Sequence, residues 1–284
     1  MKISIVTPSL NQGRYLRDAL ESVRAQEHTS VEHLVMDGGS NDETLSLLQA
    51  LSGCEGWKHL SWRSEHDSGQ SDALNRGFDE ASGDIVGWLN SDDRYRPGCF
   101  DHVVKAFEED PDVDVLYGDF AVMNQDGARL RVRREIDFNR FILLYHRVSY
   151  IPTPATFFRR RVFDDGNRLQ PHLHYAMDYE FFLRLADAGY EIRHIPHVLA
   201  DFRVHPESKS CSRELAQARE KRQIMWSFSP ISKRIESPLL RRSAFTGMQW
   251  AASLMRYSEK MLRGYYLHGA VPEGGAGEVV PPGA

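Results

Sequence analysis

A continuous apolar run ends in an acidic turn at Ile85-Val86-Gly87-Trp88-Leu89-Asn90-Ser91-Asp92-Asp93. An apolar run of this length is typical of a strand that is buried on both faces of a sheet. Helical periods flank it, and their apolar faces carry Ala73, Leu74, Gly77, Phe78 and Ala81 before the run and Phe100, Val103, Val104 and Phe107 after it. Pro97 suits the first turn of the second helix. Strands that alternate with helices in this way indicate a parallel α/β sheet.

The same alternation extends to the N-terminus and breaks after residue 117. Short apolar runs predict strands at 3–6, 34–36, 59–62 and 113–117, and a helix after the first presents Leu16, Ala19, Leu20 and Val23 on one face. A hairpin with strands at 120–123 and 130–133, a short strand at 155–158, a helix from Asp178 to Gly189 and a strand at 198–204 follow. Beyond Ser212 the chain looks helical, with a second stretch near 239–266, and the Gly- and Pro-rich residues 269–284 are predicted to be disordered.

Length and composition limit the class of protein. The 284 residues are 41% apolar and 26% charged, which suits one or two soluble domains and excludes a disordered chain, a collagen-like repeat and a multispan membrane protein. Three cysteines, at 54, 99 and 211, are too few and too far apart for a disulfide framework or a zinc site. The N-terminus lacks the apolar core and cleavage site of a signal peptide. We therefore expect a protein of the reducing cytoplasm.

The net charge of −5 is unevenly distributed along the chain. Residues 1–202 carry 22 Lys and Arg against 33 Asp and Glu, whereas residues 203–268 carry 13 against 5. The acidic body argues against nucleic-acid binding. The basic segment has two interpretations: a helix lying on anionic lipid, or a helix packed on the body or on a partner subunit with its basic residues in water.

We expect the packed helix, because the apolar residues between Leu239 and Tyr266 spread over more than one face. The protein would then be soluble and at most peripherally associated with the inner face of the cytoplasmic membrane. The sequence leaves open whether the protein forms a homo-oligomer.

Polar clusters follow three of the predicted strands, at residues 7–12, 37–42 and 90–93. In open α/β sheets, ligands bind outside the carboxyl ends of the strands. Each cluster alone is an ordinary turn, but three on successive strands indicate a site. Asp92 and Asp93 are adjacent carboxylates that need a nearby cation, and Mg²⁺ or Mn²⁺ would share its oxygen ligands with a substrate phosphate. The chain has neither the Gly-rich dinucleotide fingerprint nor the P-loop, which argues against a dehydrogenase and a P-loop NTPase.

Several of these segments, in this order and over about residues 2–212, resemble the motifs of family-two glycosyltransferases of the GT-A fold. The first is Thr7-Pro8-Ser9-Leu10-Asn11. The others are residues 37–44, 65–77, 88–93, 178–185 and 202–210. The resemblance implies a Rossmann-like, mostly parallel sheet flanked by helices, with a small antiparallel part on the acceptor side. It divides the chain into a catalytic domain at 1–212, a helical C-terminal extension at 213–268 and a tail at 269–284.

The resemblance also implies roles for the matching residues. The donor-binding set is Thr7, Pro8, Ser9, Asn11, Asp37, Asp67, Asp72, Arg76, Asn90, Ser91 and Asp92. Asn90 replaces the first acid of the family's D-x-D motif, so the metal falls to Asp92 and Asp93, both expected outside the core, with His205 as a late ligand. Asp178 matches the general base.

Structural alternatives remain for three of these residues. Asp178 could serve as a helix N-cap and nothing more. His205 could be a structural hydrogen-bonding residue, and Arg76 could pair with Asp72 across one helical turn.

The implied reaction moves a sugar from a nucleotide-diphospho-sugar, by default a UDP-sugar, to an acceptor hydroxyl with inversion. The cofactor is a divalent cation, Mn²⁺ or Mg²⁺. The acceptor is a saccharide or a lipid-linked saccharide, in bacterial-type cell-surface polysaccharide or glycolipid synthesis. Two alternatives are a sugar-1-phosphate nucleotidyltransferase, whose Gly-rich N-terminal loop with an Arg is missing, and a catalytically inactive GT-A-like scaffold module, against which the intact Asp92, Asp93 and Asp178 count.

Overall fold

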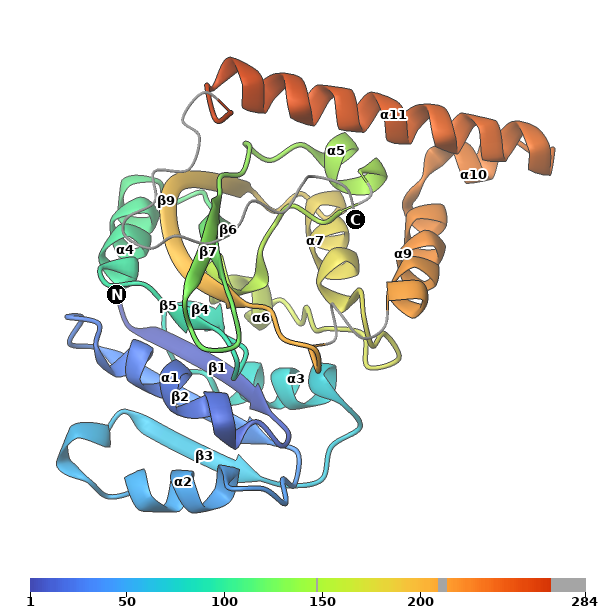
Figure 1. The fold of residues 1–284 in the computed structure, drawn as a ribbon. Helices are drawn as coiled ribbons and strands as arrows, with labels where there is room; N and C mark the ends of the chain where they lie inside the picture. Colours follow the sequence, from blue (N-terminus) through green and yellow to red (C-terminus); the bar gives the residue numbers. More distant parts are fainter. Residues whose placement is uncertain (147, 209–213, 267–284) are drawn as a thin grey trace.

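The computed structural model describes residues 1–146, 148–208 and 214–266, and Figure 1 shows their arrangement. In these residues nine strands form one sheet, with the order β3-β2-β1-β4-β8-β6-β9-β5 and with β7 paired to β6. The strands are β1 (Ile3–Ser9), β2 (Val31–Asp37), β3 (Leu60–Ser64), β4 (Ile85–Trp88), β5 (Arg94–Tyr95), β6 (Val115–Met123), β7 (Arg129–Arg133), β8 (Thr156–Arg159) and β9 (Ile192–Arg203).

The sheet has a parallel half and a mixed half. Strands β3, β2, β1 and β4 run parallel to one another, whereas β8 is antiparallel to both β4 and β6, and β5 is antiparallel to β9. Strands β6 and β9 are parallel, and β7 completes a hairpin with β6. The predicted parallel α/β sheet with a smaller antiparallel part is confirmed.

Helices cover both faces of the parallel half. They are α1 (Gly13–Arg24), α2 (Thr44–Leu51), α3 (Gln70–Glu80) and α4 (Cys99–Glu109). Ile85 of β4 belongs to the apolar cluster that contains Phe100 of α4, and its neighbour Val86 belongs to the cluster that contains Leu74 of α3. This alternation confirms that β4 is buried on both faces, because successive strand residues point to opposite sides. A Cβ at Gly77 of α3 would collide with Val6 of β1, so glycine lets this helix approach the sheet closely.

Two sequence predictions about these elements are wrong. The sequence predicts separate strands at 113–117 and 120–123, but β6 is one strand of nine residues, with register shifts against β9 around Asp119. Asp119 accounts for the continuity, because it is buried and accepts hydrogen bonds from the Glu135 N–H and from His194. Pro97 lies outside α4, because the helix begins after Gly98, whose φ of 75° is left-handed.

The remaining helices are α5 (Arg140–Tyr145), α6 (Arg161–Asp164), α7 (Met177–Asp187), α9 (Glu214–Phe228), α10 (Pro230–Arg234) and α11 (Pro238–Leu262), with short 3₁₀ turns η1 (Glu55–Trp57) and η2 (Thr153–Ala155). Helix α11 lies across α5 at the end of the molecule opposite β3, and α9 stands beside α7 (Figure 1). Among the described residues, no helix combines the length and the apolar composition that a membrane span requires. The predicted tail, 269–284, and Cys211 lie outside the described residues.

Helix α11 packs on the body as expected, through Phe245 and Ala252 in the main apolar cluster. The prediction that its basic residues lie in water is wrong for Arg256 and Lys260, which are buried. Both contact the fully buried carboxylate of Glu135, and the Lys260 Nζ lies 3.0 Å from it. The opposite face of α11 is apolar and exposed, because Arg256 and Lys260 lie on the inner face, where they contact Glu135.

Candidate active site

The three predicted polar clusters meet at one edge of the sheet. Strand β1 lies between β2 and β4, and Ser9 at the end of β1 is in register with Asp37 at the end of β2. The loops after these strands are joined by hydrogen bonds from the Asn11 N–H to Ser40 Oγ (2.7 Å) and from the Asn41 N–H to Asn11 Oδ1 (2.9 Å). Asn11 has a φ of 54°, a left-handed conformation that Asn tolerates. The carboxyl ends of three parallel strands therefore form one continuous polar edge.

Asp37 organises the loop that follows β2. Its buried carboxylate accepts hydrogen bonds from the backbone N–H groups of Gly39 and Ser40 and from the Ser40 and Ser64 hydroxyls. Thr7, on the neighbouring strand, is fully buried and its hydroxyl lies 2.9 Å from His33 Nε2. Burial, with a contribution from His59, lowers the pKa of His33 to about 3, so this histidine is neutral. The side chains of Thr7 and Asp37 thus hold the edge in shape from within.

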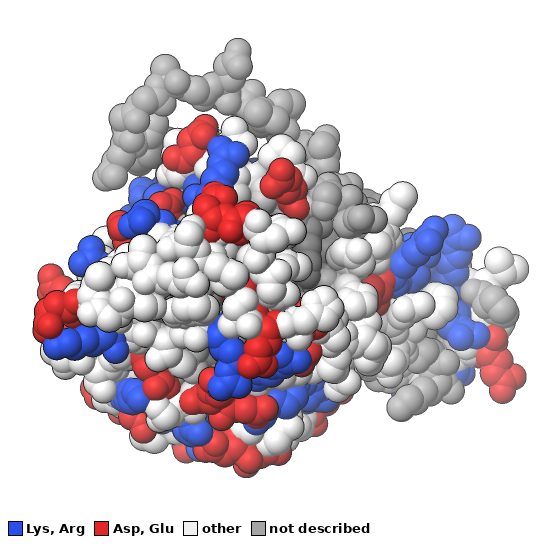
Figure 2. Space-filling view, turned by 90° about the horizontal axis from the view of Figure 1, so that it is seen from below, with Lys and Arg blue, Asp and Glu red and all other residues white. Residues whose placement is uncertain are grey.

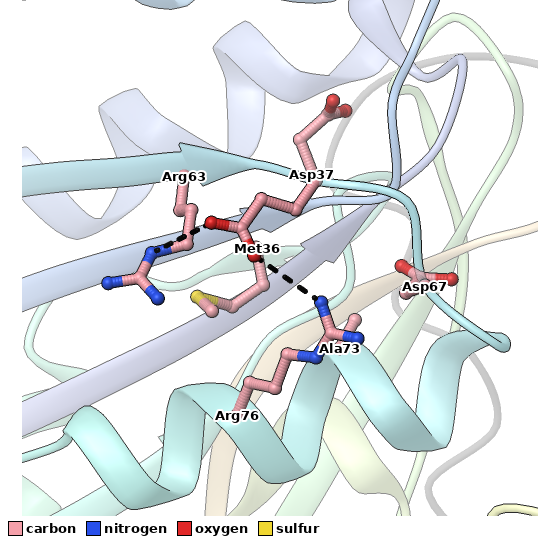
Figure 3. A pocket seen from close by; sticks show the side chains of 7 residues that line it. Met36, Asp37, Arg63, Asp67, Ala73 and Arg76 are labelled. Carbon is pink, nitrogen blue, oxygen red and sulfur yellow. Dashed lines mark ion pairs between the residues drawn. The ribbon is translucent and has the colours of Figure 1, made fainter.

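A small charged hollow lies beside the end of β2, and Figure 3 shows its lining. Glu65 lies 3.8 Å from both Arg63 of β3 and Arg76 of α3. The residues that line the hollow are Met36, Asp37, Arg63, Glu65, Asp67, Ala73 and Arg76.

The residues around the hollow are also held to one another. Arg76 makes the ion pair with Asp72 that its spacing in the sequence allowed, at 2.9 Å. Asp67 accepts a hydrogen bond from the Gly69 N–H, and a Cβ at Gly38 would approach Asp67 Oδ2 to 2.6 Å. Glycine at 38 therefore lets the loops after β2 and β3 come together around Asp67.

The face of the molecule on the β3 side mixes both signs of charge. Figure 2 shows acidic and basic side chains interspersed over the described residues there, with no continuous basic strip of the kind that nucleic-acid-binding proteins present.

The acidic turn after β4 divides its two carboxylates between the interior and the surface. Asp93 is fully buried, and it accepts hydrogen bonds from Asn90 Nδ2 (3.0 Å) and from the Arg203 N–H (2.9 Å). Burial and the neighbouring Asp92 raise the pKa of Asp93 well above its ordinary value, while these two donors oppose the rise. The expectation that Asp93 lies outside the core is therefore wrong. This placement argues against Asp93 as a metal ligand, because its carboxylate is fully buried and is held by donors within the protein, whereas Asp92 is partly exposed.

Asn90 and Ser91 connect the acidic turn to its neighbours. Asn90 Oδ1 accepts hydrogen bonds from Gln70 Nε2 (2.9 Å) and from the Trp88 indole N–H (2.8 Å). Ser91 donates its hydroxyl to the Pro8 carbonyl at 3.1 Å. These contacts fix the turn against α3 and β1, so that Asp92 is the carboxylate that it presents outward.

Asp92 and His205 lie together although they come from different parts of the chain. Asp92 Oδ2 is 3.1 Å from His205 Nε2, and the carboxylate is 22% exposed. The His205 ring is buried beside Tyr15, and its Nδ1 has no hydrogen-bond partner among the described residues. Among those residues no cluster of three or more His, Cys, Asp or Glu side chains forms a complete metal site.

Arg203 is a residue of this site to which the sequence analysis gave no role. Its guanidinium is buried over the Tyr15 ring, and it donates to Asp18 (2.6 Å), to the Asp92 carbonyl (2.8 Å) and to the Gln125 carbonyl (2.9 Å). The only signal in the sequence was its position within the segment 202–210. Arg203 brings His205 to the acidic turn by tying the end of β9 to it.

Asp178 lies in the first turn of α7, where Ala176 holds the N-cap position. The alternative that Asp178 is the N-cap is therefore wrong. Asp178 is half-buried, and burial raises the pKa of its carboxyl group above the ordinary value, against the opposing effects of the Tyr179 N–H and the Lys221 cation. The segment that leads into α7 is attached to the start of α3, because Ser71 donates to the Leu173 carbonyl at 3.3 Å. Neighbouring residues of α3 thus contact both the acidic turn and the approach to Asp178.

The sequence resembles known glycosyltransferases. Residues 4–166 match the family model described as glycosyl transferase family 2. An uncharacterized glycosyltransferase of Mycobacterium tuberculosis is 36% identical over 187 residues, which are 65% of this chain and 68% of that protein. A PGL/p-HBAD biosynthesis glycosyltransferase of Mycobacterium bovis is 30% identical over 182 residues, which are 64% of this chain and 68% of that protein.

The fold is also that of solved glycosyltransferases. S. aureus TarS in complex with UDP-GlcNAc superposes with a TM-score of 0.66 at 17% identity, over 96% of this chain and 77% of that one. The mannosyltransferase PcManGT from Pyrobaculum calidifontis, in complex with GDP-Man and Mn²⁺, gives a TM-score of 0.59 at 16% identity, over 95% and 76%. These likenesses confirm the predicted GT-A fold class.

Proposed function

Because this chain belongs to the family 2 glycosyltransferases, we propose that it transfers a sugar, with inversion, from a nucleotide-diphospho-sugar to an acceptor hydroxyl. A UDP-sugar is the donor we expect first, and a structure of similar fold, TarS, is in complex with UDP-GlcNAc. The observation that carries the proposal is the contact of Asp92 with His205 at the carboxyl ends of the parallel strands. In open α/β sheets this is the edge where ligands bind.

The donor-binding residues form two neighbouring groups in this proposal. The nucleoside lies along the ends of β1 and β2, against the loop that Asp37 organises and the hollow that Arg76 lines. The diphosphate lies at the acidic turn. Support comes from the hydrogen bonds that join the loops after β1, β2 and β4 into one edge. The full donor-binding set is Thr7, Pro8, Ser9, Asn11, Asp37, Asp67, Asp72, Arg76, Asn90, Ser91 and Asp92.

A divalent cation, Mn²⁺ or Mg²⁺, fits the residues at the acidic turn. Asp92 offers a partly exposed carboxylate, and His205 Nε2 lies 3.1 Å from it, so an oxygen donor and a nitrogen donor face each other at the turn. Such cations commonly take one or two protein ligands and complete their shell with substrate phosphates and water. When bound, the cation would neutralise charge on the departing diphosphate. Asp92 and His205 would hold it, and Asp93 would orient the turn from inside.

Asp178 is the proposed general base. Its carboxylate would accept the proton of the acceptor hydroxyl as that oxygen attacks the anomeric carbon from the face opposite the leaving diphosphate. The raised pKa suits this role, because a carboxylate with a higher pKa is a stronger base near neutral pH. A single displacement with one base and no enzyme nucleophile inverts the anomeric configuration.

We further propose that the enzyme works at the inner face of the cytoplasmic membrane, on a saccharide or lipid-linked saccharide of a cell-surface polysaccharide or glycolipid. Support comes from an exposed apolar stripe on α11, with Trp250, Leu254, Tyr257 and Met261 spaced so that they share one face. Trp and Tyr favour the interface between lipid and water. The exposed residues Arg234 of α10 and Arg242 of α11 would complement anionic lipid.

A donor panel tests the proposed reaction. UDP-, GDP- and dTDP-sugars are added to the whole protein with and without Mn²⁺, and both the thermal shift and the release of nucleoside diphosphate are followed. A ligand at about 100 times its Kd stabilises the folded state by about 2.7 kcal/mol. The transferase releases nucleoside diphosphate slowly without acceptor, a nucleotidyltransferase depends on pyrophosphate, and a scaffold module does neither.

A further inference from the structure

The α9 helix supplies a carboxylate to the start of α7. Glu220 accepts hydrogen bonds from the backbone N–H groups of His174 (2.9 Å), Tyr175 (2.6 Å) and Ala176 (2.6 Å). These residues immediately precede α7, whose N-cap residue, Ala176, has no side chain that could cap the helix. A negative charge at a helix N-terminus is favourable, because it satisfies N–H donors and opposes the positive end of the helix dipole. A residue far along the chain therefore holds the backbone from which Asp178 projects.

The next residue of α9 places a positive charge beside Asp178. Lys221 Nζ lies 4.8 Å from the centre of the Tyr179 ring, and its cation interacts electrostatically with the Asp178 carboxylate. Burial lowers the pKa of Lys221 to about 8, while Asp178 opposes that effect. At neutral pH Lys221 is therefore still mostly protonated.

Other charged groups, of both signs, act on Asp178 and Lys221. Glu220 acts on Asp178 in the direction opposite to Lys221, and Arg256 of α11 acts on Lys221. His146 also interacts with Lys221, and burial lowers the pKa of His146 to about 4, so it is neutral near pH 7. Among the described residues, Lys221 is therefore the cation that acts most directly on the Asp178 carboxylate.

We propose that Glu220 and Lys221 are positioning residues for Asp178: Glu220 fixes the start of α7, and Lys221 keeps the Asp178 carboxylate ionised. The inference rests on the proposed role of Asp178 as the base. It makes α9 a working part of the acceptor-side site, whereas the sequence had assigned this helix to a separate C-terminal extension.

Two substitutions with opposite electrostatic effects test the role of Lys221. The pKa of Asp178 is measured by NMR titration of its carboxyl carbon, assigned with Asp178→Asn. Lys221→Met removes the cation and should raise this pKa by about one unit or more. Glu220→Gln removes the opposing anion and should lower it, and Lys221→Arg should keep it near the wild-type value. Arg222→Met, which removes an exposed cation from the same helix, is the matched control and should leave the pKa unchanged.

The pH dependence of turnover gives the functional readout. The acid limb of kcat should move to higher pH in Lys221→Met, return in Lys221→Arg and stay in place in Arg222→Met, with donor affinity unchanged in all three. An Asp178 pKa that is identical in wild type, Lys221→Met and Glu220→Gln would overturn the inference. The comparison in Glu220→Gln stands even if Lys221→Met does not fold.

Backbone hydrogen exchange tests the role of Glu220. Glu220→Gln should speed exchange at residues 174–176 by roughly tenfold or more, because a neutral amide accepts these hydrogen bonds more weakly. The exposed Glu236→Gln is the control. Unchanged exchange at all three amides would contradict the proposed anchoring. None of the NMR or exchange measurements requires turnover, so a wild-type protein without transferase activity would refute the proposed function and leave these results interpretable.

Discussion

His205 Nε2 lies 3.1 Å from Asp92 Oδ2, although the two residues are 113 positions apart in the sequence. The contact depends on Arg203, which binds both the acidic turn and the loop beyond β6. The proposed cation site is thus assembled from the end of a parallel strand and the end of β9.

Asp92→Ala and Asp93→Ala should have different effects. Asp92→Ala should weaken Mn²⁺-dependent binding of nucleoside diphosphate by more than about tenfold and leave the fold intact. Asp93→Ala should lower the free energy of unfolding by about 1–3 kcal/mol, because Asn90 and the Arg203 N–H lose a buried acceptor. Calorimetry and chemical unfolding measure the two effects. Mn²⁺-dependent binding that is unchanged in Asp92→Ala would refute the metal assignment.

Asp178→Asn should retain donor affinity and lose about 10²- to 10⁴-fold in kcat, because the amide cannot accept the proton. In the wild type the base is active only when ionised, so kcat should fall as the pH falls through the pKa of Asp178. Since burial raises this pKa, the fall should begin above the ordinary value for Asp of about 3.9. Rapid-quench assays over pH 4–8 give the profile. Retention of more than a tenth of wild-type kcat would exclude Asp178 as the base.

Glu135→Gln should destabilise the protein by roughly 3–5 kcal/mol, because Arg256 and Lys260 stay buried after losing their shared carboxylate. Unfolding monitored by circular dichroism in urea provides the measurement. Glu109→Gln breaks an exposed ion pair with Lys105 and should change stability by less than about 1 kcal/mol. Equal losses in the two variants would show that the buried cluster does not anchor α11.

Trp250→Ser and Leu254→Ser should each reduce pelleting with anionic vesicles, because each side chain is about 70% exposed in solution (70% and 69%) and would be buried in the lipid interface. Burial of one such side chain contributes about 1.5–3 kcal/mol, so each loss should weaken partitioning about tenfold or more. Co-sedimentation with phosphatidylglycerol vesicles at physiological salt is compared with neutral phosphatidylcholine vesicles. Leu130→Ser, which removes an exposed leucine from β7, is the control. A wild-type protein that stays in the supernatant and elutes as a dimer would assign the stripe to a second copy of the chain.

The sequence predicted those parts of the fold that depend on local pattern. The alternation of Ile85 and Val86 between two apolar clusters, and the meeting of Ser9 with Asp37, follow from strand and helix periods and from the geometry of parallel sheets. It could not predict which of two adjacent carboxylates points inward. Asp93 is buried because Asn90 and Arg203 offer it donors, and that depends on where β9 ends.

The C-terminal helices show the same limit more strongly. The sequence pattern of α11 predicted that its basic residues lie in water. Nothing local in the sequence indicates that Glu135, more than a hundred residues earlier, packs against the helix. Likewise, Glu220 looks like one more polar residue of α9 until the tertiary structure brings it to residues 174–176. Long-range ion pairs carry no periodic signal, and they decide which face of a helix turns inward.

The hairpin turn between β6 and β7 limits which changes to this protein can be engineered, because its main-chain carbonyls hold two arginines. Arg203 donates to the Gln125 carbonyl, and Arg94, directly after the acidic turn, donates to the Gly127 carbonyl at 3.0 Å. Both contacts use main-chain oxygens, so a library that varies the exposed side chains of this turn should leave the donor edge undisturbed. A loop graft that inserts or deletes one residue would shift those carbonyls, release two arginines and misalign the acidic turn without touching a single residue of the proposed donor site.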